Sequence, residues 1–234
     1  MAANAGTFDA GMAAWQAWQR APWGRLYYDV AHANLARHLG AAPLAILDAG
    51  GGNGADALRL AEQGHDVTLL DYSTEMLADA RRAAEADGVA DRLTVRQGDC
   101  LAIPDLFPGQ PFDVVLCHNV LQYAADAGTL LGAVTAPLRR GGLLSLLAPN
   151  RHAEPLRAAL REGDLAAAYA LLDAPTRQTH VFKATMRLYT ASEVAALLGA
   201  PGYVVIGQYG VRCLCDYLPD DGRKDDPAYY AELE

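Results

Sequence analysis

From residue 44 onward, short apolar runs alternate with stretches whose apolar positions have helical spacing. The apolar runs have strand length, and a glycine cluster, Gly50–Gly54, follows the first of them. Strands that alternate with helices of 10–15 residues are typical of parallel βαβ units, with helices on both faces of the sheet. The pattern therefore predicts a doubly wound α/β fold. Its strands are expected at 44–48, 66–71, 93–96, 112–117 and 143–147, and its helices at 55–63, 73–86 and 127–138.

Two segments do not follow this alternation. Residues 8–40 have a helical pattern, and residues 151–189 contain two short helical stretches, 154–161 and 165–172, with a polar basic loop. We expect an N-terminal helical cap at 1–43 and a main domain at 44–234 that carries a cap insertion at about 151–189. Ligands of such sheets bind at the carboxyl ends of the strands, so both segments are candidate covers for that edge. A helix at 192–198 and a β-rich run at 203–217 follow the second segment.

Composition narrows the class of protein. The 234 residues are 52% hydrophobic and 20% charged, which is enough to bury the core of one ordinary domain. The longest apolar run is about eight residues, whereas a membrane span needs about 20. The first residues have neither the basic nor the apolar region of a secretory signal. Four cysteines make no disulfide framework in a chain of this length. We expect a reduced, cytoplasmic protein.

The charge is unevenly distributed. The chain has a net charge of −9, which argues against a protein that coats nucleic acid. Residues 44–150 account for most of the negative charge, whereas 1–43 and 151–189 are each slightly positive. A local basic site therefore remains possible. The basic residues of the second segment are Arg151, Arg157, Arg161, Arg177, Lys183 and Arg187.

The strongest motif is Leu47-Asp-Ala-Gly-Gly-Gly-Asn-Gly54, a glycine loop between a strand and a helix. Such a loop lets backbone amides approach a ligand closely, and the helix N-terminus favours negative charge there. The motif matches the dinucleotide-binding fingerprint, and it also looks like the first motif of class I methyltransferases. Asp48, two residues before the first glycine, favours the second interpretation, with Gly50, Gly51, Gly52 and Gly54 as cofactor contacts.

Two further acids follow the next two strands. Asp71, followed by Tyr72, ends the second strand, where a carboxylate binds both ribose hydroxyls of S-adenosylmethionine. Asp99 and Cys100 follow the third strand, beside the position of the adenine. A nicotinamide enzyme needs more chain for its substrate than remains here, so a methyltransferase is favoured over a dehydrogenase. Each acid also has a structural alternative: Asp71 as a solvated strand end, Asp99 as a helix cap, and Asp48 as a residue that holds the loop.

His118 ends the fourth strand. Its side chain is expected to face the methyl donor, and two roles are open. It is a candidate general base, because an imidazole titrates near neutral pH. Alternatively, it packs against the donor or makes structural hydrogen bonds, and this second role is favoured.

The motifs extend beyond the glycine loop. Gly64-His-Asp-Val-Thr-Leu-Leu-Asp-Tyr-Ser-Thr-Glu-Met-Leu77, Arg140-Gly-Gly-Leu-Leu-Ser-Leu146 and Gly210-Val-Arg-Cys-Leu-Cys-Asp-Tyr-Leu218 belong to the same pattern. With these segments the chain resembles the bacterial tRNA 5-carboxymethoxyuridine methyltransferases, from about residue 15 to its end. The resemblance implies cofactor contacts at Gly50, Gly51, Asp71, Asp99, Cys100 and His118.

The chain departs from this family in three places. The family has Gly-x-Leu-Arg where this chain has Gly24-Arg-Leu-Tyr27, so Arg25 becomes the candidate for the cofactor carboxylate. The lysine-rich stretch of the family is much less basic here, at 175–184. The family chain also continues through one more strand. We therefore expect the run at 203–217, or a neighbouring chain, to cover that edge of the sheet.

These observations predict an S-adenosylmethionine-dependent methyltransferase that acts on an oxygen or nitrogen of a small, anionic metabolite. The candidate acceptor residues are Arg177, Lys183, Arg187 and Tyr27. One alternative is methylation of the tRNA wobble carboxymethoxyuridine, and a further one is a non-catalytic, cofactor-binding subunit. We expect no metal and no membrane partner, and the oligomeric state stays open.

Overall fold

The computed structural model describes residues 5–179, 181–199, 202–218 and 221–233, which form two compact units. The first unit contains residues 5–10, 40–148 and 182–185, and we call it the sheet unit. The second contains the described residues of 11–39, 149–181 and 186–233, and we call it the helical unit. In the described part of the chain, no helix combines the length and apolar character needed to cross a membrane.

The sheet unit contains five parallel strands in the order β3-β2-β1-β4-β5. This arrangement confirms the predicted doubly wound fold. Chain order reverses beside β1, between β2 and β4, and ligands of such sheets bind at the carboxyl ends of the strands at this point. The strands are β1 (Ala45–Ala49), β2 (Asp66–Asp71), β3 (Leu93–Gln97), β4 (Phe112–His118) and β5 (Leu138–Leu147).

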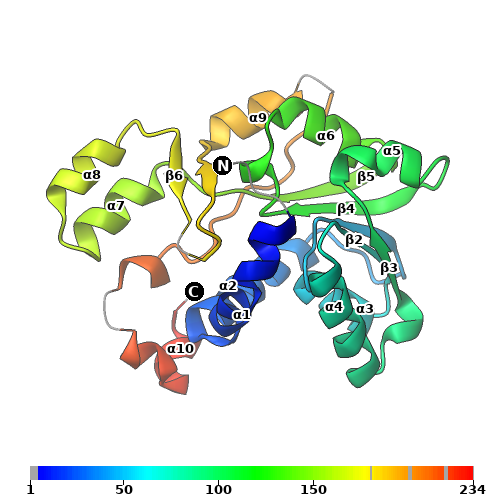
Figure 1. Cartoon of the computed structure of the whole chain (residues 1–234), viewed down its shortest axis with the longest axis horizontal. Helices are drawn as coiled ribbons and strands as arrows, with labels where there is room; N and C mark the ends of the chain where they lie inside the picture. Colours follow the sequence, from blue (N-terminus) through cyan, green and yellow to red (C-terminus); the bar gives the residue numbers. More distant parts are fainter. Residues whose placement is uncertain (1–4, 180, 200–201, 219–220, 234) are drawn as a thin grey trace. The chain divides into compact units, whose positions relative to one another are not determined.

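Helices cover both faces of this sheet, with α3 and α4 on one side and α6 on the other (Figure 1). Leu47, Leu69 and Leu116 in the central strands are completely buried between them. The helices are α3 (Ala55–Glu62), α4 (Thr74–Ala86), α5 (Ile103–Leu106) and α6 (Ala127–Thr135). The 3₁₀ turns are η1 (Ala90–Arg92), η2 (Cys100–Ala102) and η3 (Leu121–Tyr123).

Local sequence signals set the limits of these helices. The hydroxyl of Ser73 accepts a hydrogen bond from the Met76 amide at 3.1 Å and so caps the start of α4. Gly64, with a φ of +93°, lets the chain turn away after α3 and enter β2. Both signals are readable in the sequence.

Strand β5 begins earlier than the sequence predicts. The sequence predicts a helix at 127–138 and a strand at 143–147, with Gly141-Gly142 between them, but β5 already starts at Leu138. Its pairing with β4 is irregular around this pair, where Gly141 has a φ of +72°. A Cβ at Gly142 would lie 2.9 Å from the carbonyl oxygen of Asp113. The glycines therefore accommodate a bulge within the strand rather than ending an element.

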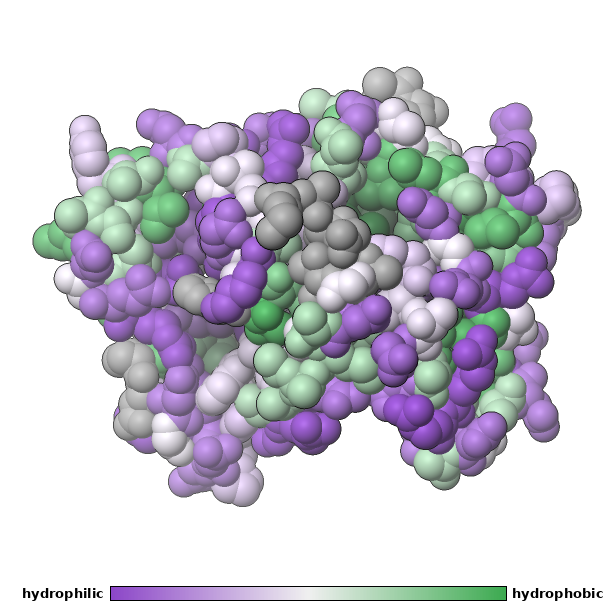
Figure 2. All heavy atoms as spheres, viewed as in Figure 1, coloured by the Kyte–Doolittle hydropathy of each residue, from purple (hydrophilic) through white to green (hydrophobic). Residues whose placement is uncertain are grey.

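The helical unit consists of short helices and a two-stranded sheet. Helix α1 begins in the sheet unit and continues in the helical unit from Gly11. Large apolar side chains of α7 and α8 remain exposed and form a hydrophobic area at the left of Figure 2. The helices are α1 (Ala5–Arg20), α2 (Pro22–Ala36), α7 (Ala153–Leu160), α8 (Leu165–Leu171), α9 (Ala191–Gly199) and α10 (Pro227–Ala231). The remaining elements are β6 (Thr176–Gln178), β7 (Thr185–Arg187), η4 (Cys215–Tyr217) and η5 (Gly222–Asp225).

The predicted cap limits differ from the limits of the two units. Residues 5–10 and 182–185 group with the sheet, although the sequence assigned both to caps at 1–43 and 151–189. That the remainder of these segments covers the strand ends stays a prediction.

The strand predicted within 203–217 is wrong. The described residues of this run contain no strand, and its last three form η4. Val204, Val205 and Ile206 are exposed. A high β propensity reflects packing against neighbouring strands, so it does not produce a strand where no partner is paired. In the described sheet β5 is an edge strand, and a neighbouring chain at that edge stays a prediction.

A buried lysine organises the C-terminal part of the helical unit. The Lys224 side chain is completely buried, and its Nζ donates to the carbonyl oxygens of Cys215 and Leu218 at 2.8 and 2.9 Å. It also donates to the Asp221 carboxylate at 2.8 Å. Arg161 donates to the same carboxylate. Three acceptors, one of them the ion-paired carboxylate of Asp221, thus compensate for the burial of this ammonium group.

We predict that Lys224→Met lowers the free energy of unfolding by about 1–3 kcal/mol, because buried carbonyls lose their donor. Amide hydrogen exchange should become faster in residues 221–233, while the sheet strands keep their protection. Arg223→Met, which removes the same charge one residue earlier, is the control. Unchanged exchange in 221–233 of the Lys224 variant would contradict this role.

Candidate cofactor and active site

The glycine loop joins β1 to α3 and has no room for a side chain at Gly50 or Gly51. Gly50, Gly52 and Gly54 have φ values of +74°, +58° and +79°, which glycine adopts readily. A Cβ at Gly50 would lie 2.6 Å from Cγ2 of Val120, and one at Gly51 would lie 2.2 Å from Oδ2 of Asp48. The loop therefore brings backbone directly to the N-terminus of α3, as a ligand that contacts main-chain atoms requires.

Asp71 connects the end of β2 to this loop. Its Oδ2 accepts a hydrogen bond from the Gly52 amide and its Oδ1 one from the Ser73 amide, both at 2.9 Å. Burial raises the pKa of Asp71, while these two hydrogen bonds act in the opposite direction. Each carboxylate oxygen has a second lone pair. The arrangement is therefore a fixed, double acceptor that fits the two hydroxyls of a ribose.

Asp99 and Cys100 follow β3, and Tyr72 follows β2. Oδ1 of Asp99 accepts from the Leu101 amide at 2.8 Å, so Asp99 caps η2, and this structural alternative is confirmed. Burial raises the pKa of the Cys100 thiol and of the Tyr72 phenol, so both stay protonated at neutral pH. The Sγ of Cys100 lies 3.5 Å from the Cβ position of Gly50. Contacts of Asp99, Cys100 and Tyr72 with the adenosine remain predictions.

Four aromatic residues from distant segments meet in the sheet unit, and we call them the aromatic clasp: Phe8, Tyr72, Tyr123 and Phe182. The Phe8 ring lies 5.7 Å from Tyr72, 5.2 Å from Tyr123 and 4.7 Å from Phe182, measured between ring centroids. Asp9 accepts a hydrogen bond from the Ser73 hydroxyl at 2.5 Å. Sequence reasoning missed this clasp, because single aromatic residues in segments far apart in the chain leave no pattern.

His118 is the centre of a buried hydrogen-bond network. Its Nδ1 lies 2.8 Å from Oδ2 of Asp56, near the start of α3, and its Nε2 lies 2.8 Å from Oγ of Ser145 in β5. Burial by itself would lower the pKa of His118, but the Asp56 carboxylate, helped by Asp48, outweighs it and raises the pKa. Both ring nitrogens therefore have protein partners. This favours a structural role over a general base, and Asp56 and Ser145 are site residues that the sequence analysis did not include.

The order Asp56–His118–Ser145 has the connectivity of a hydrolytic triad. Ser145, however, lies inside β5, paired in register with Leu116 of β4. A nucleophilic serine is instead presented at an exposed turn. The network therefore links β4, β5 and α3 and does not indicate a hydrolase.

Asp48 lies next to this network and is completely buried. Among the described residues, neither of its carboxylate oxygens has a hydrogen-bond partner of normal geometry. Burial, followed by the charge of Asp56, raises the pKa of Asp48 to about 7; His118 acts in the opposite direction, and the nearby Ala57 amide contributes least. The alternative that Asp48 holds the loop by hydrogen bonds is therefore not supported, although it packs directly under Gly51.

The predicted acceptor residues are divided between the two units. Lys183, at a φ of +52°, belongs to the sheet unit and follows Phe182 of the aromatic clasp. The other three belong to the helical unit: Arg177 pairs with Glu154 at 2.7 Å, Arg187 lies over the Tyr189 ring, and Tyr27 packs against Trp18 and Tyr28. Arg25, the candidate for the cofactor carboxylate, is also in the helical unit; it donates to the Arg20 carbonyl at 2.6 Å and lies over the Tyr230 ring. The functional roles of all five remain predictions.

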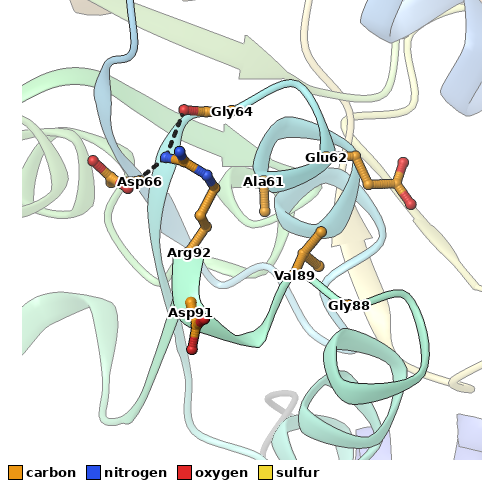
Figure 3. Close-up of a pocket in the computed structure, with 8 residues that line it drawn as sticks. All are labelled: Ala61, Glu62, Gly64, Asp66, Gly88, Val89, Asp91 and Arg92. Carbon is orange, nitrogen blue, oxygen red and sulfur yellow. Dashed lines mark hydrogen bonds and ion pairs between the residues drawn. The ribbon is translucent and has the colours of Figure 1, made fainter.

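A surface pocket lies at the opposite, amino end of the strands (Figure 3). Arg92 donates there to the Gly64 carbonyl at 2.9 Å and to Asp66 at 3.1 Å. This pocket contains none of the predicted site residues. Its lining residues are Ala61, Glu62, Gly64, Asp66, Gly88, Val89, Asp91 and Arg92.

The chain is similar in sequence to known methyltransferases. A family model described as a methyltransferase domain matches residues 42–194. The chain is 33% identical to the tRNA 5-carboxymethoxyuridine methyltransferase of Escherichia coli strain K12 over 84% of this chain and 73% of that protein. It is also 33% identical to a ubiquinone biosynthesis O-methyltransferase of Paramagnetospirillum magneticum, over 78% and 68% of the two chains. The chain belongs to the S-adenosylmethionine-dependent methyltransferases. It is an enzyme of class I of that group.

Solved structures agree with this assignment at the level of the fold. A methyltransferase from Mesorhizobium loti has a TM-score of 0.61 and 23% identity, and covers 85% of this chain and 89% of its own. One from Thermotoga maritima has a TM-score of 0.61 and 16% identity, over 86% and 81%. The cofactor of the methyltransferase is S-adenosylmethionine. The glycine cradle, the double acceptor Asp71 and the orphaned buried carboxylate of Asp48 fit this cationic nucleoside.

We predict that Asp71→Ala weakens binding of S-adenosylhomocysteine by about 10–100-fold, because two loop amides and the ribose hydroxyls lose their acceptor. Isothermal calorimetry measures this directly, with NAD as a ligand that the parent protein should not bind. Asp66→Ala, at the other end of the same strand, is the control. Equal affinity of the Asp71 variant and the parent would refute the ribose assignment.

For His118, we predict that His118→Ala reduces activity mainly through donor affinity, because neither ring nitrogen is open to an acceptor proton. A general base would instead contribute about 10²–10⁴-fold to kcat. Kinetics at saturating donor separate the two, and a loss of that size with unchanged donor binding would make His118 catalytic.

The raised pKa of His118 adds a second measurement, the pH dependence of the free energy of unfolding. The stability that His118→Ala loses should be largest at acid pH, and it should shrink as the pH rises through the folded-state pKa.

Proposed function

We propose that this methyltransferase transfers a methyl group to an oxygen or nitrogen of a small molecule that carries an anionic group. The exposed position of Lys183 beside the aromatic clasp supports this most directly. Lys183 belongs to the sheet unit, and it follows Phe182, which contacts Phe8. Phe8 in turn contacts Tyr72, next to the ribose-binding candidate Asp71. No ion pair of Lys183 is present among the described residues, so its ammonium group is available to a carboxylate or phosphate.

The chemistry places few demands on the protein. When bound, S-adenosylmethionine supplies an electrophilic methyl group that an acceptor displaces in line. Catalysis then depends mainly on positioning and on exclusion of water. The glycine loop and Asp71 position the donor, while the aromatic clasp excludes water beside them. A carboxylate or other ionised acceptor needs no base, in accordance with the engagement of both His118 nitrogens.

The charges of the helical unit support a small acceptor over tRNA. Binding of RNA phosphates requires arginine and lysine side chains that can exchange their counterions. Most arginines of the 151–189 segment instead have carboxylate partners within the protein. The pairs are Arg151–Glu193, Arg157–Glu154, Arg157–Glu162, Arg161–Asp221 and Arg177–Glu154.

Donor labelled in its methyl group distinguishes the candidate functions. The methyltransferase is incubated with bulk tRNA in one reaction and with a small-metabolite extract in another. We expect label in a small, anionic product. Label in tRNA would favour the activity of the Escherichia coli relative, and donor binding without transfer to either pool would favour a non-catalytic subunit.

We further predict that Lys183→Ala raises the KM for the labelled acceptor by about tenfold, with donor affinity unchanged, because one charge-assisted contact is lost. Lys183→Arg should retain most of the activity. Arg140→Ala, which removes an exposed charge of β5, is the matched control. An unchanged KM in Lys183→Ala would remove this residue from the acceptor site.

A further inference from the structure

The carboxylate of Asp48 is unusual for a protein interior, because it is buried and no hydrogen bond or ion pair among the described residues offsets the loss of its hydration. Its side chain has no exposed area, and neither oxygen has a hydrogen-bond partner of normal geometry in the described part of the chain. Oδ2 lies 2.2 Å from the point where a Cβ of Gly51 would be. Asp48 is therefore directly beneath the loop that holds the donor, and only a glycine at 51 permits this contact.

Several ionisable groups surround Asp48, and they come from each neighbouring element. Asp56 belongs to α3, His118 and Cys117 to β4, Asp71 to β2 and Cys100 to η2. Burial raises the pKa of Cys117 to about 12 and that of Cys100 as well, so both thiols are neutral. Asp71 already accepts two amide hydrogen bonds.

Asp56 and His118 compensate each other as an ion pair at 2.8 Å. Ionised Asp48 therefore adds a negative charge that no cation hydrogen-bonds among the described residues, and His118, whose charge favours ionised Asp48, is already paired with Asp56. A buried, unpaired carboxylate is costly, and a protein lowers the cost by keeping the group protonated or by binding a cation. The methyl donor is such a cation, since its sulfur is a sulfonium. After transfer the sulfur is a neutral thioether, and the rest of the molecule is unchanged.

We propose that Asp48 is the counter-charge by which this site prefers the sulfonium donor to its thioether product, and that donor binding releases a proton from the cluster of Asp48, Asp56 and His118. In the free protein the Asp48 carboxyl is largely protonated below neutral pH. Binding of the cation favours the carboxylate, and the proton leaves to solvent. After methyl transfer the sulfonium charge is gone, so the carboxyl takes up a proton again and its attraction for the sulfur of the ligand is lost. The inference rests on the donor and does not depend on the identity of the acceptor.

This coupling has a definite sign. A group whose pKa is about 7 in the free protein binds a proton below that pH, and a cation must displace it there. Donor affinity should therefore rise as the pH increases from about 6 to 8, by up to about tenfold for each unit by which the donor lowers the pKa. Product affinity should be nearly constant over the same range.

Calorimetry of the parent protein tests the proposal without any variant. Donor and S-adenosylhomocysteine are each titrated at about pH 6.5 in two buffers with different ionisation enthalpies, which gives the number of protons released. We expect donor binding to release on the order of half a proton more than product binding. Equal proton release by the two ligands would overturn the proposal, even if both bind tightly.

Asp48→Asn assigns the proton to its residue, since the amide is similar in size and carries no charge. The variant should bind the product as the parent does, and it should lose the additional proton release and about tenfold in donor affinity. Asp91→Asn, an exposed acid at the amino end of β3, is the charge-matched control. Additional proton release that persists in Asp48→Asn would contradict the role of Asp48. A failure of either ligand to bind the parent protein would instead contradict the donor site itself.

Discussion

The hydrogen bonds of Asp71 are the constraint on which the donor site depends. Its two oxygens hold the Gly52 amide of the glycine loop and the Ser73 amide before α4. One side chain at the end of β2 thereby fixes the positions of a loop after β1 and a helix after β2. Because the carboxylate has further lone pairs, the same atoms can position a ribose. Architecture and ligand recognition therefore share one group, and a substitution at Asp71 affects both.

The two units differ in how far their buried and partly buried charges are paired. In the helical unit, carboxylates pair with most of the arginines near residues 151–177, and the buried Lys224 has three acceptors. In the sheet unit, Asp56 and His118 form a buried pair, while Asp48 has no such partner in the part of the chain that the structure describes. A charge that a protein leaves uncompensated in its interior is expensive. Because Asp48 lies under the donor loop, we infer that its unpaired carboxylate attracts a bound cation.

Much of the fold was predictable because its signals are local. The alternation of apolar runs and helices predicts β1 to β4 and the helices α3, α4 and α6 within a few residues, and Ser73 and Gly64 act as the expected cap and stop. The two errors have a common cause. The start of β5 depends on a bulge against β4 at Gly141-Gly142, and a strand within 203–217 would depend on a partner strand. Pairing with another segment decides both, and a local pattern contains no information on it.

The sequence by itself determined the class of fold, the glycine loop, the acid at the end of β2 and hence the cofactor, because each is specified by neighbouring residues in a motif. Only the tertiary structure decided that both nitrogens of His118 have hydrogen-bond partners and that Asp48 has none among the described residues. It also decided that Lys183 groups with the sheet rather than with the cap. These are properties of distance and burial. They arise when segments far apart in the chain pack together, and the physical chemistry of each side chain follows from that environment.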